Sequence, residues 1–137
     1  MTNLQNINTS EQSLGEVKYY STRVVIKGLN QEGNLWYLIK LRVEDISSTA
    51  IFTVFDNEVE QLIGMPVTNL EKIKASNIED YNNIITNICD KELIFSVKVQ
   101  DKEYGNRSFR SITVQSIKEI SDEVIETEPK KIKLEDL

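Results

Sequence analysis

Residues 34–56, NLWYLIKLRVEDISSTAIFTVFD, constrain the fold more than any other part of the chain. Side chains along a strand point alternately to its two sides, and here apolar and polar residues alternate with a period of two. Ser47 and Ser48 break the pattern at a short polar turn. At Asp56 the apolar spacing becomes helical, with a glycine at 64 and a proline at 66 to end the helix. The stretch therefore predicts two antiparallel strands that lead into a helix.

Three more segments have the composition of strands, namely residues 17–28, 93–100 and 107–117. A helical connector is expected between 56 and 89, and no β-α-β repeat is present to build a parallel sheet. These patterns predict an all-β fold with a helical connector, a five-stranded OB-fold barrel in the order β-β-β-α-β-β. The expected domains are a disordered lead-in over 1–15, the OB-fold domain over 16–118 and an acidic tail over 119–137.

The composition excludes several kinds of catalytic and metal site. The chain has no histidine and one cysteine, Cys89, which excludes imidazole catalysis, an internal disulfide and a four-cysteine zinc site. We expect Cys89 to pack as a small apolar residue. No glycine-rich phosphate loop or paired-carboxylate motif is present, so an enzyme is not expected, and neither is a cofactor or a metal. The chain lacks both a long apolar run and a leader pattern, so no membrane association is expected.

The order FTVFD, EVEQLIG, LIFSVKV and SITVQSI resembles the C-terminal OB-fold domain of the replication protein A large subunit over about residues 34–118. That resemblance implies a module that holds single-stranded DNA. The family's domain carries a four-cysteine zinc ribbon between its first two strands, where this chain has only LNQEGN at 29–34. The chain therefore resembles a divergent branch without the ribbon. The family's C-terminal assembly helix has at most a short acidic counterpart at 119–128.

The resemblance implies that the outward positions of the later strands form the ligand face. Aromatic rings can stack on bases, and lysine and arginine can neutralise phosphates. The candidate nucleic-acid-binding residues are Trp36, Lys40, Arg42, Ile51, Thr53, Lys98, Gln100, Tyr104, Arg107 and Phe109.

Structural roles are open for the same residues. The strand cations could be merely solvated, Trp36 could pack at a rim, and Tyr104 could brace its turn. Phe109 could cover the end of the barrel. Arg107 and Arg110 could pair with Asp101 and Glu103 across the hairpin.

The net charge of −6 weakens the DNA interpretation, because polyanion binders usually carry basic surfaces. Residues 119–137 account for −4 of it and residues 1–118 for only −2. The barrel is thus close to neutral, and one of its faces could still be basic.

The tail carries two short patterns. Lys130, Lys131 and Lys133 match a basic nuclear import motif, which predicts a nuclear protein. Residues 132–135 also have the form of a SUMO acceptor site, and both patterns often arise by chance in a solvated tail. A docking role, as an amphipathic peptide on a partner, is the other interpretation. Its candidate docking residues are Ile117, Ile120, Val124 and Ile125.

Two functions therefore remain open. The first is a replication protein A-like subunit of a nuclear hetero-oligomer that binds single-stranded DNA weakly or through shared contacts. The second is a protein–protein interaction module that scaffolds a DNA-processing or chromatin complex without touching DNA.

Overall fold

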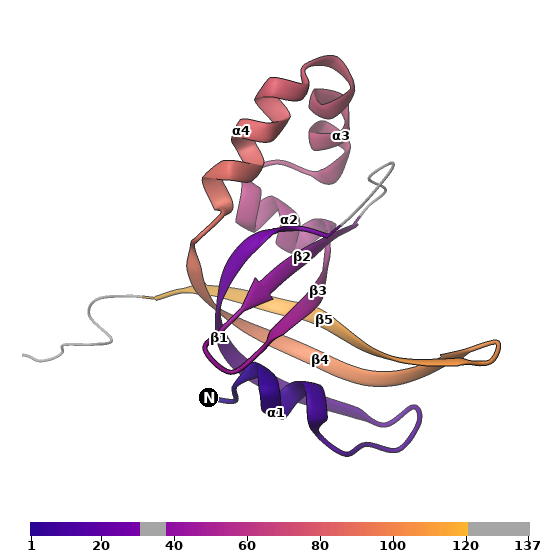
Figure 1. Ribbon diagram of the computed structural model, residues 1–137. Helices are drawn as coiled ribbons and strands as arrows, with labels where there is room; N and C mark the ends of the chain where they lie inside the picture. The colour runs from indigo at the N-terminus through magenta and orange to yellow at the C-terminus, as the bar shows by residue number, and fades with distance from the viewer. Residues whose placement is uncertain (31–37, 121–137) are drawn as a thin grey trace, which may run out of the picture.

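The computed structural model describes residues 1–30 and 38–120 and consists of five strands and four helices within them (Figure 1). In chain order the elements are α1 (Leu4–Thr9), β1 (Val17–Leu29), β2 (Leu38–Glu44), β3 (Thr49–Phe55), α2 (Asp56–Ile63), α3 (Val67–Ser76), α4 (Ile78–Ile88), β4 (Glu92–Tyr104) and β5 (Arg107–Glu119). The five expected strands are present. The expected order is wrong in its helices, because one precedes β1 and three join β3 to β4.

The strands close into a barrel in the order β1-β2-β3-β5-β4, with β4 returning to β1. All neighbours are antiparallel except β3 and β5, which run parallel and meet at Thr53 and Thr113. The single residue pair between β3 and β5 closes the barrel.

The barrel interior is filled by the apolar half of each alternating pattern. Ile39, Leu41 and Val43 of β2 are fully buried, as the period of two predicts. Phe52 and Phe95 meet across the core with ring centroids 5.5 Å apart. Burial of this kind stabilises a fold by roughly 1.5–3 kcal/mol per large side chain, so these positions determine which side of each strand faces outward.

The three helices α2, α3 and α4 cover one end of the barrel (Figure 1). Gly64 ends α2 in the left-handed conformation, φ +94°, as the sequence predicts. Asp56 does not cap α2, although aspartate is a residue type that often caps helices. It is the first residue of that helix, and its Oδ1 instead accepts a hydrogen bond of 2.8 Å from the backbone N–H of Val67, at the start of α3.

The opposite end of the barrel is covered by α1, which corrects the expected disordered lead-in (Figure 1). Leu4 and Ile7 are fully buried in the main core, and the carboxamide oxygen of Asn3 caps the helix by accepting from the N–H of Asn6. The segment looks unstructured in sequence because it has only two inward apolar residues among polar ones. Packing against the barrel, rather than helix propensity, stabilises it.

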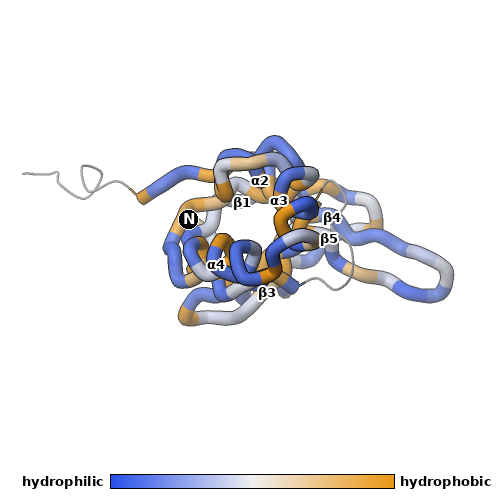
Figure 2. The backbone as a smooth tube through the Cα atoms, turned by 90° about the horizontal axis from the view of Figure 1, so that it is seen from above, coloured by the Kyte–Doolittle hydropathy of each residue, from blue (hydrophilic) through white to orange (hydrophobic). Residues whose placement is uncertain are grey.

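The last two strands extend beyond the barrel. β1 pairs with β4 only as far as Gln100, after which β4 pairs with β5 alone up to a tight turn at Gly105, φ +62°. We call residues 101–110 of this two-stranded ribbon the arm. Figure 2 shows the hairpin projecting away from the ring of strands, with mostly hydrophilic residues along it. The sequence pattern had indicated only a turn over residues 101–106.

Candidate nucleic-acid interface

One row of outward side chains crosses four strands of the barrel. Lys40 of β2 is opposite Thr53 of β3, Thr53 is opposite Thr113 of β5, and Thr113 is opposite Lys98 of β4. The same register continues to Tyr19 on β1, opposite Lys98, with 67% of its surface exposed. The predicted residues Lys40, Thr53 and Lys98 therefore lie on one continuous outer surface, which we call the front face.

The front face continues along the arm. Because pairs two residues apart share a side of a ribbon, the pairs Gln100–Ser111, Lys102–Phe109 and Tyr104–Arg107 follow Lys98–Thr113 on the same side. Tyr104 and Phe109 are 82% and 50% exposed, and Lys102 and Arg107 are exposed as well. The ribbon thus presents cations and aromatic rings in alternation, the combination that holds a single strand by phosphate and by base.

Sequence reasoning misses a cation and an aromatic ring of the front face, Lys102 and Tyr19. The residues around Lys102 have the composition of a turn, so this segment is not recognised as a strand in the sequence. The alternation of β4 nevertheless continues through Lys102 to Tyr104. Tyr19 stands out in sequence only as part of a β-rich segment. Extending the alternation of β4 past Gln100 finds Lys102, whereas the position of Tyr19 beside Lys98 needs the β1–β4 register.

Arg42 is held against the barrel by a bulge in β1. Gly28, opposite Arg42, has φ +150°, and an ideal Cβ built on it would lie 3.2 Å from Nη2 of Arg42. The guanidinium lies over the glycine and donates through Nη2 to the Lys27 carbonyl at 3.2 Å. The side chain stays exposed, so its orientation is set while other N–H groups can reach a phosphate.

Two predicted residues, Gln100 and Ile51, are partly engaged within the protein itself. Gln100 lies on the front face, but its Nε2 donates to the Gly15 carbonyl at 3.1 Å, so the amide holds the loop before β1. Ile51 is half-buried opposite Arg42 and offers apolar surface only. Trp36, the remaining candidate, lies outside the described residues.

The side of the arm opposite the front face carries the ion pair that the sequence left open. Arg110 binds Asp101 with two hydrogen bonds, Nε to Oδ1 at 2.7 Å and Nη2 to Oδ2 at 2.9 Å. The hydrogen bond and charge of Arg110 lower the pKa of Asp101 despite some burial, and the same pairing raises the pKa of Arg110. Arg107, on the other side, belongs to the front face.

Of the predicted docking residues, only Ile117 and Ile120 lie among the residues that the structure describes. Ile117 lies in β5 and is only 9% exposed within the barrel core, so the expectation that it docks a partner is wrong. The apolar spacing around Ile117 fits both a strand and a helix. In the structure Ile117 is paired with Phe95 of β4, so the segment is a strand. Ile120 is half-buried just after β5. The other tail candidates, namely Val124, Ile125, Lys130, Lys131 and Lys133, lie outside the described residues.

The part of the front face on β4 and β5 differs from the rest of the chain in its charge. Its outward positions from Lys98 to Tyr104 and from Arg107 to Thr113 contain no acid. Within residues 1–30 and 38–120, no three His, Cys, Asp or Glu side chains are grouped so that they could hold a metal ion. The described helices include none that is long and apolar enough to cross a membrane.

Comparison with known proteins supports the resemblance noted in the sequence. Residues 27–128 match the family model of the replication factor-A C-terminal domain. One 70 kDa DNA-binding subunit of replication protein A from Oryza sativa subsp. japonica is 26% identical over 76 residues, 56% of this chain and 12% of that protein. Replication factor A protein 1 of Saccharomyces cerevisiae is 23% identical over 88 residues, 64% of this chain and 14% of that protein. The chain thus spans only a small part of these relatives.

Two solved structures share the fold. A chain of a replication protein A heterotrimer bound to single-stranded DNA matches 90% of this chain with a TM-score of 0.74 and 14% identity, and 36% of that chain is covered. A chain of yeast replication protein A bound to single-stranded DNA matches 86% with a TM-score of 0.68 and 16% identity, and 84% of that chain is covered. Since the family model spans most of the described barrel, this chain belongs to the replication factor-A C-terminal domain family.

Proposed function

We propose that this chain is a replication protein A-like OB-fold subunit that binds single-stranded DNA through its front face. The observation that carries the proposal is the row from Lys40 to Lys98 and its continuation along the arm to Arg107 and Phe109. Phosphate-binding cations and stacking rings alternate there without an intervening acid. Both similar structures are of replication protein A bound to single-stranded DNA, which agrees with this use of the fold.

Binding by this chain alone should be weak. The net charge of −6 opposes a polyanion, and only part of the front face carries cations. A replication protein A structure that resembles this chain is a heterotrimer, so we propose that other protein subunits share the DNA contacts in a hetero-oligomer. The proposed role is binding rather than catalysis.

A fluorescence-anisotropy titration of the full chain with labelled oligo-dT at low salt tests the proposal. OB-folds cover roughly 4–16 nucleotides, so an oligonucleotide of about that length suffices. We expect micromolar binding that weakens steeply with salt, because each neutralised phosphate adds about −0.7 to the slope of log K against log salt. No change in anisotropy at tens of micromolar would exclude direct DNA contact by this chain.

A matched pair of charge variants localises the site. Lys98→Glu with Lys102→Glu reverses two front-face charges, whereas Lys72→Glu with Lys91→Glu makes the same change in α3 and in the turn after α4. We expect the first pair to abolish binding and the second to reduce it only slightly. Equal losses would mean that binding follows net charge and not the front face.

We further propose that the chain acts in the nucleus, on the basis of Lys130, Lys131 and Lys133 in the tail. A fluorescent fusion of the chain should accumulate in nuclei, and replacing the three lysines with alanine should spread it through the cell. Nuclear accumulation that survives the replacement would remove the basic motif as its cause.

The second candidate function is protein–protein interaction without DNA contact, which a groove of about 700 Å³ between the N-terminus and the β2–β3 turn favours. Its rim includes the exposed apolar residues Met1 and Ile46, and its lining includes Arg23, Glu44, Asp45 and Glu92. A partner presenting apolar side chains would fit it. Co-purification of such a partner, lost in Ile46→Asp and retained in Lys98→Glu/Lys102→Glu, together with no oligo-dT binding, would favour this function.

A further inference from the structure

The short helix α1 touches two parts of the molecule that carry the front face. Its apolar side, Leu4 and Ile7, is buried in the core at one end of the barrel. Its polar groups contact the β2–β3 turn at one end of the helix and the base of the arm at the other. The helix lies beneath the strands that lead into the arm (Figure 1).

The N-terminal end of α1 is fixed to the β2–β3 turn by Asp45. Its Oδ2 accepts from the Leu4 N–H at 2.9 Å, while its Oδ1 accepts from the N–H groups of Ser47 and Ser48 at 2.8 and 3.0 Å. From the last turn of α1, Asn8 Nδ2 also reaches this region and donates to the Thr49 carbonyl at 2.9 Å. Burial disfavours ionisation of Asp45, but a hydrogen bond from the Ser47 hydroxyl, together with these backbone hydrogen bonds, outweighs it and lowers the pKa. A carboxylate here also suits the positive end of the helix.

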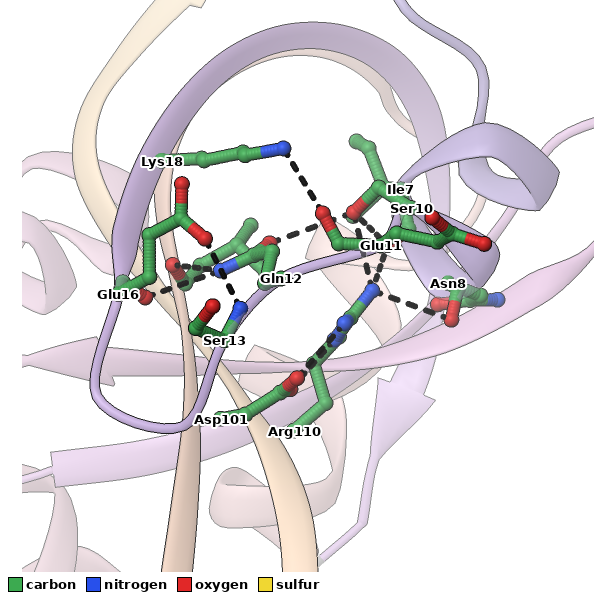
Figure 3. A network of polar contacts seen from close by, with 11 residues as sticks. Ile7, Asn8, Ser10, Glu11, Gln12, Ser13, Glu16, Lys18, Asp101 and Arg110 are labelled. Carbon is green, nitrogen blue, oxygen red and sulfur yellow. Dashed lines mark hydrogen bonds and ion pairs between the residues drawn. The ribbon is translucent and has the colours of Figure 1, made fainter.

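The C-terminal end of α1 is fixed to the arm by Arg110 (Figure 3). Nη1 of Arg110 donates to the Ile7 carbonyl at 2.9 Å, to the Asn8 carbonyl at 3.3 Å and to Ser10 Oγ at 3.0 Å. The rest of the same guanidinium binds Asp101 on the neighbouring strand of the arm. One planar group therefore joins both strands of the arm to the helix, which the single ammonium of lysine cannot do.

A second layer of contacts supports the same joint. Gln12 Nε2 donates to the Glu16 carbonyl at 3.0 Å (Figure 3) and to the Val99 carbonyl at 3.1 Å. The Gly15 N–H donates to the Asp101 carbonyl at 3.0 Å. The loop after α1 thus runs along β4 where the arm begins. An unsupported two-stranded ribbon is marginally stable and twists strongly, so its direction depends on such contacts.

We infer that α1, Asp101 and Arg110 form a brace that sets the direction of the arm relative to β2 and β3, with Arg110 as a positioning residue for single-stranded DNA. This inference rests on the proposed function. Lys102 and Phe109 face away from the brace, so the brace acts on DNA only through their placement. Holding them in place before binding reduces the ordering cost of the complex.

Two variants of opposite charge test the brace. Arg110→Met removes a positive charge and Asp101→Asn removes a negative one, so electrostatics alone predicts opposite effects on DNA affinity. The brace predicts that both weaken oligo-dT binding, by about tenfold, because both release the arm. It also predicts faster hydrogen exchange of the amides of residues 102–109 in both variants. Arg110→Lys should fall between the wild type and Arg110→Met.

Arg23→Met is the matched control. Arg23 also forms a two-bond pair with a carboxylate, Glu92, at 2.9 and 3.3 Å, but this pair joins β1 to the start of β4, at the other end of β4 from the arm. This variant loses the same charge as Arg110→Met and should leave exchange in the arm unchanged. Urea unfolding of each variant verifies that the barrel is still folded, and Asp101→Asn provides the test if Arg110→Met does not fold.

The outcomes separate the brace from its alternatives. If Arg110→Met lowers the salt slope by about 0.7, Arg110 contacts a phosphate itself and the brace is wrong. Unchanged exchange in residues 102–109, or tighter binding by Asp101→Asn, overturns it equally. If the wild-type chain does not bind oligo-dT, the proposed function fails, while the exchange measurement still decides whether α1 holds the arm.

Discussion

On one side of the arm Arg110 is bound by Asp101 and by α1, whereas on the other side Lys102, Arg107 and Phe109 are exposed. The two sides lie on the same two strands and differ only by one position in the alternation. Arg110 and Arg107 are three residues apart, yet one has its donors occupied within the protein and the other faces solvent. The role of a cation on this ribbon therefore follows from which side it occupies.

This contrast explains how a chain with a net charge of −6 can carry a locally basic surface, as the proposed DNA binding requires. The acids of the arm, Asp101 and Glu103, alternate with Lys102 and Tyr104 and so lie on the braced side. Period-two sorting leaves the front face basic and aromatic although the sequence of the arm is mixed.

The largest expected effect is a difference in unfolding free energy between a substitution in the brace and one on the front face. Ile7→Ala removes a fully buried side chain of the brace and should lower the free energy of unfolding by about 2–5 kcal/mol, since a cavity is left in the core. Phe109→Ala, at a half-exposed position, should lower it by less than about 1 kcal/mol. Urea unfolding measures both, and similar losses would contradict the division into a structural side and a binding side.

The next largest effect is a difference in oligo-dT affinity between substitutions on and off the front face. Phe109→Ala should weaken oligo-dT binding by about 1–3 kcal/mol if one base stacks on its ring. Ile46→Ala, which truncates an exposed apolar residue on the β2–β3 turn, is the control and should have no effect. Anisotropy titrations at one salt concentration compare the two, and equal affinities would remove Phe109 from the interface.

A smaller effect concerns a single front-face cation. Lys102→Gln should reduce the slope of log K against log salt by about 0.7, corresponding to one phosphate contact. Lys72→Gln on α3 should leave the slope unchanged. Titrations over a series of salt concentrations provide both slopes. A slope that Lys102→Gln does not change would limit the DNA site to the barrel part of the front face.

The smallest effect is the pH dependence of the braced side. The pKa values of Asp45 and Asp101 are lowered in the folded chain, so the unfolded chain binds more protons in the acid range. Their contribution to stability is complete above the ordinary aspartate pKa of about 3.9 and is lost as pH falls through the folded values. Asp101→Asn should flatten the acid limb of unfolding free energy against pH. An unchanged limb would mean that Arg110 does not stabilise the charged form.

The barrel could be predicted from sequence because its signal is local. The alternation around Ile39, Leu41 and Val43 determines both the strand and its buried side. The same alternation placed Lys40, Arg42 and Lys98 correctly on the outside. Buried apolar residues at period two leave little freedom for the residues between them.

The brace could not be predicted because its contacts join distant segments. Leu4 and Ile7 are two apolar residues in a polar segment, and only the barrel gives them a place to be buried. Arg110 contacts residues about 100 positions away, so no local pattern marks it as different from Arg107. The prediction that Ile117 docks a partner was wrong for a related reason. With so few apolar residues, the same spacing fits both a strand and a helix.

The most direct test of the front face is a map of backbone amide shifts in the full chain on titration with oligo-dT, followed by NMR. We expect the largest changes along β2 and β3 at Lys40, Arg42 and Thr53, and along β4 and β5 at Lys98, Lys102 and Phe109. Residues lining the groove around Ile46 and those of α4 should not change. Shifts that gather at the groove, or that are spread evenly over the barrel, would contradict the assignment of the front face as the DNA-binding surface.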